Sequence, residues 1–293
     1  MADKLKNIKE KIRKELAKNP AYLDGCDVPA LKAVLFETGS ACNRKCAWCP
    51  NYTTDRGNHF LGDKVFYKVM AELKEMKFEG RVSFSMYNEP LLDKRLPKFI
   101  EHVRKNIPSA YIYLNTNGDA LTSDVWKSLR GKGLDYANVS QYDGKINENI
   151  EKILNGLDSG ERKHLGAHIF DLNTINNRAG LIKSRALEKP LQEKCSRPSY
   201  QLCINYKGEV VVCCNDYHGS VTVGDAGKES IKDLWSNYVF KFYRKKLSEG
   251  DRASLELCNL CDLCSSPVPP IYPKPSFAAR ARRALRQIIN NYK

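Results

Sequence analysis

Between residues 31 and 172 the chain alternates between two hydrophobic periods. Short apolar runs typical of buried strands occur at 31–38, 81–86, 111–116, 135–142 and 164–172, and segments with apolar residues at helical spacing lie between them, at 63–77, 92–106, 122–130 and 147–157. Strands that alternate with helices form a parallel sheet. Five strands are too few for a closed eight-stranded barrel. The pattern therefore predicts an α/β fold, a partial (β/α) barrel of about five to six parallel strands, in which a sixth strand has no clear place in the sequence.

The pattern changes near Cys195. Residues 201–206 and 209–213 flank Lys207-Gly208 and predict a β-hairpin, and residues 230–247 predict one helix. A cysteine-rich segment and a proline-rich stretch follow. We therefore expect a basic helical extension at 1–30, the barrel at 31–186, a small β-hairpin and helix domain at 187–266, and a linker with a second basic helix at 267–293.

Positive charge is concentrated at the two ends of the chain. The 48 Lys and Arg exceed the 34 Asp and Glu by 14, yet residues 1–18 hold seven basic residues against three acidic ones, and residues 274–293 hold six against none. Apolar residues recur at helical spacing in both ends: Leu5, Ile8, Ile12 and Leu16, and Phe277, Ala281, Leu285 and Ile288. Each end is predicted to be an amphipathic helix docked on the domain, with contact to an anionic surface or partner as the alternative. Because the body between carries little excess charge, there is no strong nucleic-acid signal.

Cysteine usage needs a chemical explanation. No run of about 18 apolar residues is present, and the first residues contain no apolar signal-peptide core. We therefore expect a cytoplasmic protein, in which disulfides are rare. The 11 cysteines then indicate metal binding as the first candidate.

The first cysteine group is Cys42, Cys46 and Cys49, spaced as CxxxCxxC in a loop after the first strand, where α/β sheets place their chemistry. Three thiolates can bind three irons of a [4Fe–4S] cluster and leave the fourth iron open to another ligand. A structural zinc site requires four ligands, and a lone residue such as His59 is a weak fourth. The spacing therefore favours iron–sulfur over zinc.

This motif resembles that of the radical S-adenosylmethionine (SAM) superfamily. Tyr87-Asn88-Glu89-Pro90 ends the second strand, where that family has a Gly-Gly-Glu-Pro-like motif, and Asn115-Thr116-Asn117-Gly118 ends the third. Only Glu89 and Pro90 of the first segment match, since Tyr and Asn replace the two glycines. The resemblance implies SAM bound at the open iron, with contacts from Trp48, Asn88, Glu89, Pro90, Asn115, Asn117 and Ser140.

A second cysteine group resembles the SPASM or shorter twitch auxiliary domain found after radical SAM cores. Its members are Cys195, Cys213, Cys258 and Cys261, and the resemblance implies one auxiliary [4Fe–4S] cluster that they ligate completely. A four-cysteine zinc ribbon is the alternative. Of the remaining cysteines, Cys26 and Cys203 are expected to be ordinary residues, whereas Cys214 and Cys264 are candidate ligands, structural thiols or hydrogen-atom donors.

The resemblance also implies a first chemical step. An external one-electron donor such as flavodoxin or ferredoxin reduces the first cluster, and SAM is cleaved to a 5′-deoxyadenosyl radical that abstracts a hydrogen atom from the substrate. If the auxiliary cluster accepts an electron, a carbinol becomes a ketone. If Cys264 or Cys214 returns a hydrogen atom, the product is an epimer. If a neighbouring group traps the radical, a peptide is crosslinked.

Arg178 favours the first of these outcomes. It precedes Cys195 by 17 residues in a segment that resembles radical SAM dehydrogenases of aminocyclitol antibiotic biosynthesis, where an arginine contacts the reacting hydroxyl. Arg178 is therefore expected to bind the substrate and act in catalysis, and Asp216 to hydrogen-bond a polyol. The predicted function is a radical SAM oxidoreductase acting on a sugar- or aminocyclitol-like small molecule. An epimerase, a SPASM-type peptide-modifying enzyme and a zinc-binding nucleic-acid module are the alternatives.

Overall fold

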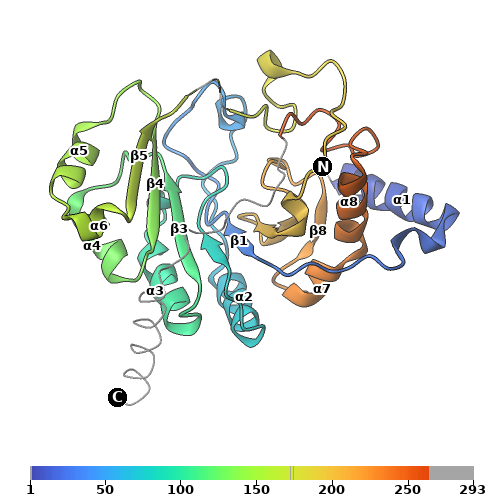
Figure 1. Ribbon diagram of the computed structural model, residues 1–293, viewed down its shortest axis with the longest axis horizontal. Helices are drawn as coiled ribbons and strands as arrows, with labels where there is room; N and C mark the ends of the chain where they lie inside the picture. Colours follow the sequence, from blue (N-terminus) through green and yellow to red (C-terminus); the bar gives the residue numbers. More distant parts are fainter. Residues whose placement is uncertain (1, 172, 174, 264–293) are drawn as a thin grey trace.

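The computed structural model describes residues 2–171, 173 and 175–263. Eight strands within these residues form one sheet in the order β5-β4-β3-β2-β1-β6-β7-β8 (Figure 1). Their bounds are β1 Ala33–Phe36, β2 Arg81–Ser83, β3 Tyr111–Thr116, β4 Tyr136–Gln141, β5 Leu165–Ile169, β6 Gln201–Ile204, β7 Glu209–Val211 and β8 Thr222–Asp225. The first five are parallel to one another, so the fold is the predicted α/β partial barrel.

The sixth parallel strand comes from the segment that the sequence pattern assigns to the β-hairpin. Strand β6 pairs in parallel with β1, from Ala33↔Gln201 to Phe36↔Ile204, and antiparallel with β7. The hairpin is therefore confirmed, and its first strand also extends the barrel. Hydrophobic period could not show this second role, because period reveals a strand without revealing its partner.

Five helices between the parallel strands lie together on one side of the sheet (Figure 1): α2 (Asp63–Glu75), α3 (Leu96–Asn106), α4 (Ser123–Gly131), α5 (Glu148–Asn155) and α6 (Ser159–Arg162). Successive residues of a strand face opposite sides of a sheet, and the helices cover the apolar side. On that side Phe36 of β1 packs edge-on against Phe66 of α2, with ring centroids 5.3 Å apart. This layer forms most of the hydrophobic core.

The opposite face of the sheet is polar. Arg81 of β2, Ser85 just beyond it, Asn115 of β3 and Gln201 of β6 line a cavity of about 350 Å³. Polar side chains on the inner face of a sheet need a ligand, water or one another as partners. The inner face is therefore the place to look for a site.

The single helix predicted over residues 230–247 is wrong. The structure has two helices, α7 (Ile231–Ser236) and α8 (Tyr238–Glu249), separated by Asn237. This residue has an extended ψ of 146°, and its side chain accepts a hydrogen bond from the Val239 backbone N–H at 2.9 Å. A short asparagine side chain competes for backbone N–H groups, so it starts a new helix where apolar spacing alone indicates a continuous one.

The N-terminal helix docks on the domain, as predicted. Helix α1 (Ala2–Lys18) lies beside α8 (Figure 1), and the side chains of Ile8 and Ile12 are only 5% and 4% exposed. The second basic helix, expected within 267–293, lies outside the described residues. No helix in the described part of the chain has both the length and the apolar character needed to cross a membrane.

Candidate active site

The first cysteine group lies in the loop between β1 and α2. Cys42, Cys46 and Cys49 all line the 350 Å³ cavity. The backbone N–H of Cys49 donates to the Cys46 carbonyl at 2.9 Å, and the backbone N–H of Arg44 points at Cys42 Sγ from 3.5 Å. Burial, with help from the neighbouring thiols, raises the pKa of Cys46 to about 11. A cluster bound here must therefore displace thiol protons.

Arg44 ties this loop to two other strand ends. Its guanidinium donates to Asp119, beyond β3, at 2.6 Å, and to Asp143, beyond β4, at 2.8 Å. The hydrogen bonds to Asp143 and Asp119 raise the pKa of Arg44, so the charge is permanent. Asn43 donates to Asp119 at 2.7 Å. The loop that carries three thiols is thus held against the carboxyl ends of β3 and β4.

Glu89 lies at the same edge of the sheet. Its carboxylate accepts hydrogen bonds from the Thr116 hydroxyl at 2.7 Å, the Asn117 N–H at 2.8 Å and the Leu91 N–H at 3.0 Å. Burial raises the pKa of Glu89, and these hydrogen bonds oppose the increase. Asn117 also donates to Asn43 at 2.8 Å and lies 3.9 Å from Cys42 Sγ. The two predicted SAM-binding segments therefore meet beside the thiol loop.

Three aromatic rings form one wall of the cavity. Trp48 stacks on Phe170 with centroids 6.1 Å apart and lies 5.8 Å from Tyr142. Burial raises the pKa of Tyr142, which keeps the phenol neutral. Ser140 lines the cavity too, with its Oγ 3.4 Å from His168 Nε2. Flat apolar walls of this kind suit an aromatic ring such as adenine.

The other predicted SAM contacts differ in whether they line the cavity. Asn88 lines the cavity and donates to Thr38 Oγ1 at 3.3 Å. Asn115 lines it as well, and donates to Ser85 Oγ at 3.2 Å. Pro90 does not line the cavity: it begins a short 3₁₀ helix, Pro90–Leu92. A fixed proline φ suits that position, so the contribution of Pro90 is to set the turn after Glu89.

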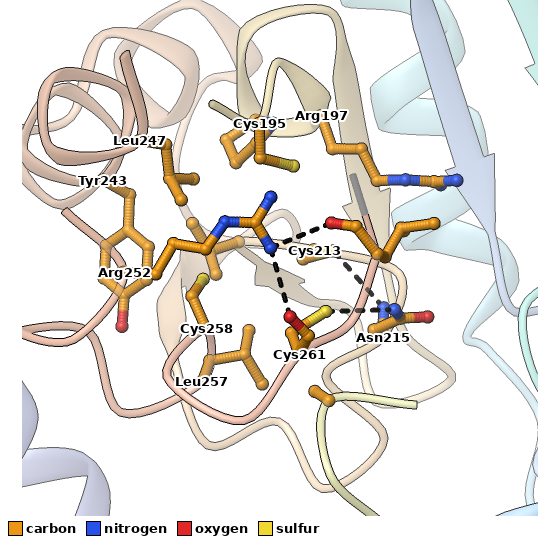
Figure 2. A pocket seen from close by; sticks show the side chains of 14 residues that line it. Cys195, Arg197, Cys213, Asn215, Tyr243, Leu247, Arg252, Leu257, Cys258 and Cys261 are labelled. Carbon is orange, nitrogen blue, oxygen red and sulfur yellow. Dashed lines mark hydrogen bonds between the residues drawn. The ribbon is translucent and has the colours of Figure 1, made fainter. Parts of the chain in front are cut away.

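The second cysteine group surrounds a smaller cavity next to the first. Cys195, Cys213, Cys258 and Cys261 all line it, between Tyr243, Leu247 and Leu257 (Figure 2). Burial raises the pKa of both Cys258 and Cys261. Four free thiols from three separate segments are the donor set that an iron–sulfur cluster requires.

Arg252 organises the loops around this second group. The residue is 1% exposed; its Nε donates to the Glu193 carbonyl at 2.7 Å, and its Nη1 donates to the Leu263 carbonyl at 2.9 Å and the Cys261 carbonyl at 3.2 Å (Figure 2). One side chain thus joins the segments that carry Cys195 and Cys261. Among the described residues no group of His, Cys, Asp or Glu is arranged for a single metal ion. Cluster thiolates each bind a different iron, so each thiol set can hold a cluster without its sulfurs converging on one point.

Tyr87 lies between the two thiol sets. It is 7% exposed, lines the larger cavity, and its hydroxyl donates to the Asn215 carbonyl at 3.3 Å. Burial raises the pKa of Tyr87, and the positive charge of Arg178 opposes this increase. The tyrosine occupies the place of the first glycine in the family motif, so a departure from that motif marks a residue at the centre of the site.

Arg178 is presented by a strained turn. Arg178 and Ala179 have positive φ values of 52° and 55°, followed by Gly180 at 82°. Asn177 holds the turn, since its side chain accepts from the Gly180 N–H at 3.0 Å and donates to the Leu260 carbonyl, in the loop of the second thiol set, at 2.7 Å. Non-glycine residues in this region are costly and recur at functional sites. The turn places Arg178 in the cavity wall, 5.9 Å from the Tyr87 ring centroid.

The remaining predicted residues have mixed outcomes. Cys214 lines the larger cavity and not the smaller one, and its Sγ accepts a hydrogen bond from Arg197 Nη1 at 3.2 Å. Asp216 lines neither cavity: its two carboxylate oxygens accept from the Ser220 hydroxyl and N–H, both at 2.8 Å, and the Val221 N–H at 2.7 Å. Asp216 therefore caps its own loop, which does not fit the expected contact with a polyol. Cys264 lies outside the described residues.

Sequence patterns did not indicate several cavity residues. These are Arg44, Arg81, Tyr87, Tyr142, Phe170 and Arg197. Arg44, Tyr87 and Arg197 lie within or beside recognisable motifs, and this position in the sequence was the signal that could have found them. Arg81, at the first position of β2, carried no signal because an arginine at a strand end is usually solvated.

A partial barrel that carries three thiols at its carboxyl edge and four more beside it defines an iron–sulfur enzyme with a substrate cavity between its two cluster sites. Comparison with known proteins agrees. Residues 36–162 match the radical SAM superfamily, and residues 195–264 match an iron–sulfur cluster-binding domain, SPASM. The chain belongs to the radical SAM superfamily. Its cofactors are SAM and two [4Fe–4S] clusters.

Individual relatives give the same picture. The chain is 32% identical, over 76% of its length and 89% of the relative, to the S-adenosyl-L-methionine-dependent 2-deoxy-scyllo-inosamine dehydrogenase of Niallia circulans. The crystal structure of BtrN in complex with AdoMet and 2-DOIA is 27% identical, with a TM-score of 0.76 over 83% of this chain and 97% of that one. Native anSMEcpe with bound AdoMet shares the fold, with a TM-score of 0.51, 13% identity, and coverage of 74% and 84%.

Proposed function

We propose that this enzyme dehydrogenates a carbinol carbon of a sugar- or aminocyclitol-like small molecule. The single observation that carries the proposal is the position of Arg178, which a strained turn holds in the wall of the cavity beside Tyr87. The name of the Niallia circulans relative describes the same reaction type on 2-deoxy-scyllo-inosamine. A polyol fits the polar inner face, where Ser85 and Asn115 offer hydrogen-bond partners for hydroxyl groups.

The residues divide the work between two ends of the cavity. When bound, SAM and its cluster would supply hydrogen-atom abstraction, and the auxiliary cluster would supply an electron acceptor. Glu89 and Asn117 hold the methionine end, and the ring wall of Trp48, Tyr142 and Phe170 holds the adenine. Arg178 orients the reacting hydroxyl as its proton leaves. The pKa of a free guanidinium exceeds about 12, so orientation and charge stabilisation are its natural contribution. A small donor such as flavodoxin or ferredoxin supplies the first electron.

A hydrogen-returning thiol gives the second candidate function. Cys214 lines the same cavity as the first thiol group, so a radical formed on the substrate there has a sulfur in the cavity wall. Return of a hydrogen atom from that sulfur makes the enzyme an epimerase. The two functions differ in product and not in their first step.

Product analysis in D₂O separates them. We expect reconstituted, reduced enzyme with SAM and a polyol substrate to give a new carbonyl, with no solvent deuterium at that carbon, when the product is examined by mass spectrometry and NMR. An inverted carbon that carries deuterium would show that the enzyme is an epimerase.

Substitution of Arg178 tests its role. We expect Arg178→Gln to lower kcat by about 10²-fold or more, within the range for positioned catalytic groups, with SAM affinity unchanged, and Arg178→Lys to restore part of the loss. Lys183→Gln is the matched control, since Lys183 is exposed in the same segment. Unchanged carbonyl formation by Arg178→Gln would exclude Arg178 from the reaction.

A further inference from the structure

Three arginines that line the cavity have no carboxylate, within the residues that the structure describes, to balance their charge. Arg81, Arg178 and Arg197 all line it, and the Nε atom of each is buried without a hydrogen-bond partner. In the described part of the chain none of the three forms an ion pair. Arg44, the fourth arginine of the lining, is already neutralised by Asp119 and Asp143.

Acidic groups of the cavity do not offset this charge. Glu89 is the one carboxylate among the described lining residues, and hydrogen bonds from Thr116, Asn117 and Leu91 engage it. It follows the carboxyl end of β2, whereas Arg81 is the first residue of that strand. The two therefore lie toward opposite ends of the cavity, so Glu89 is not the partner of Arg81.

Two of the three arginines have other assignments. Arg197 donates to Cys214 Sγ and also lines the smaller cavity with the second thiol set, so its neighbours there are sulfur atoms. Arg178 is assigned to the reacting hydroxyl in the proposed function. Arg81 has neither assignment. Its guanidinium lies 5.2 Å from the centroid of the Tyr113 ring, which carries no charge.

Arg81 lies in a row of the sheet that reaches the cavity-lining Gln201. Strand register places Ala33 beside Arg81 on β1, and Gln201 beside Ala33 on β6. Arg81 and Gln201 both line the cavity, whereas Ala33 between them is fully buried. Burial raises the pKa of Tyr200, while Arg197 and Arg81 both lie close enough to oppose the increase. Two arginines thus approach the same region from neighbouring elements.

We propose that the substrate carries an oxyanion, a phosphate or carboxylate group, that binds Arg81. Arginine presents a planar fork of donors that matches these groups, and the buried Nε of Arg81 has no hydrogen-bond partner in the described part of the protein, which is costly unless a ligand supplies one. The anionic end of the substrate then lies at the amino-terminal end of β2, and its reacting carbinol near Arg178. This deepens the proposed function and rests on it: the substrate is an acidic polyol, unlike the amine that the relative's name describes.

Binding selectivity tests the charge of the substrate without turnover. Anaerobically reconstituted enzyme saturated with SAM is titrated in a calorimeter with matched pairs: myo-inositol 1-phosphate against myo-inositol, and glucuronate against glucose. We expect the acidic member of at least one pair to bind about tenfold tighter or better, because a hydrogen bond to a charged group contributes about 1.5–3 kcal/mol. Equal binding within both pairs, or tighter binding of 2-deoxy-scyllo-inosamine, would overturn the proposal.

Variants then locate the oxyanion. Arg81→Gln should bring the acidic-to-neutral affinity ratio to within about threefold, with iron content and SAM affinity unchanged. Arg162→Gln removes the same charge outside the cavity and should leave the ratio as it is. If Arg81→Gln does not fold, Arg81→Lys is used in its place, because lysine keeps the positive charge and removes the planar set of guanidinium donors. Loss of SAM affinity with the ratio intact would show that Arg81 holds the SAM carboxylate instead.

The two proposals can fail separately. Acidic selectivity together with an epimer as product would keep the oxyanion site and overturn dehydrogenation. A ketone formed from neutral or amine polyols, with no preference for acidic ones, would keep dehydrogenation and overturn the oxyanion site.

Discussion

At the scale of single residues, one buried ion pair contacts several residues that surround the site. Glu37 and Arg56 are 1% and 7% exposed at their side chains and lie 2.8 Å apart. Glu37 also accepts from the Tyr87 N–H at 3.1 Å, and Arg56 donates to the Ser40 carbonyl at 3.2 Å. The Arg56 guanidinium lies over the Tyr217 ring, 4.5 Å from its centroid. The pair therefore links the thiol loop, the tyrosine between the clusters and the auxiliary region.

Breaking this pair should be strongly destabilising. Removal of one partner leaves an uncompensated buried charge, which costs about 3–5 kcal/mol. We expect Glu37→Gln and Arg56→Gln each to lower the free energy of unfolding by this order. The double variant should cost clearly less than the sum of the two, as measured by denaturant unfolding in a double-mutant cycle. Additive losses would mean that the two side chains do not act as a pair.

Residue chemistry was predictable where a motif carried it. The cysteine spacing and order led to both thiol sets, and the structure gathers each around its own cavity. The sequence led us to expect Asp216 at a polyol, because sequence shows a carboxylate near a ligand without showing that its own loop hydrogen-bonds it. Arg81 was not predicted as a cavity residue because sequence does not show which strands lie beside β2 around the cavity.

At the scale of elements, the hydrophobic periods predicted most of the strands and helices of the barrel. The helix predicted over residues 230–247 was wrong because local capping divides that segment. Asn237 ends α7 and starts α8 where apolar spacing continues. The same break lets α8 turn Tyr243 and Leu247 toward the second thiol set (Figure 2). A capping residue thus helps to shape the wall of the auxiliary cavity.

Replacement of the cap should destabilise this part of the protein modestly. We expect Asn237→Ala to lower the free energy of unfolding by about 1 kcal/mol, the usual loss for an N-cap asparagine. Lys232→Ala, at an exposed position of α7, should change it by less than about 0.5 kcal/mol. Chemical denaturation with the clusters in place measures both. A stabilised Asn237→Ala would mean that one continuous helix is the better packing.

At the scale of the whole molecule, the thiols form two independent centres. We expect about eight iron atoms per reconstituted chain, from two four-iron clusters. The double variants Cys42→Ala/Cys46→Ala and Cys258→Ala/Cys261→Ala should each retain about four, and Cys26→Ala should retain all of them. Iron and labile sulfide analysis checks this. Zinc in place of iron, with no brown chromophore, would overturn the cluster assignment.

Strand β6 has a consequence for how such an enzyme can be rebuilt. Because one strand closes the barrel edge and opens the auxiliary hairpin, neither half is an exchangeable module. A chimera cut ahead of β6 would leave β1 with an open edge, which invites aggregation, until the donor segment supplied a strand in the same register. A slip of one residue would turn Gln201 away from the inner face and Leu202 toward it. Recombination between relatives should therefore succeed only at junctions that transfer β1 and β6 together.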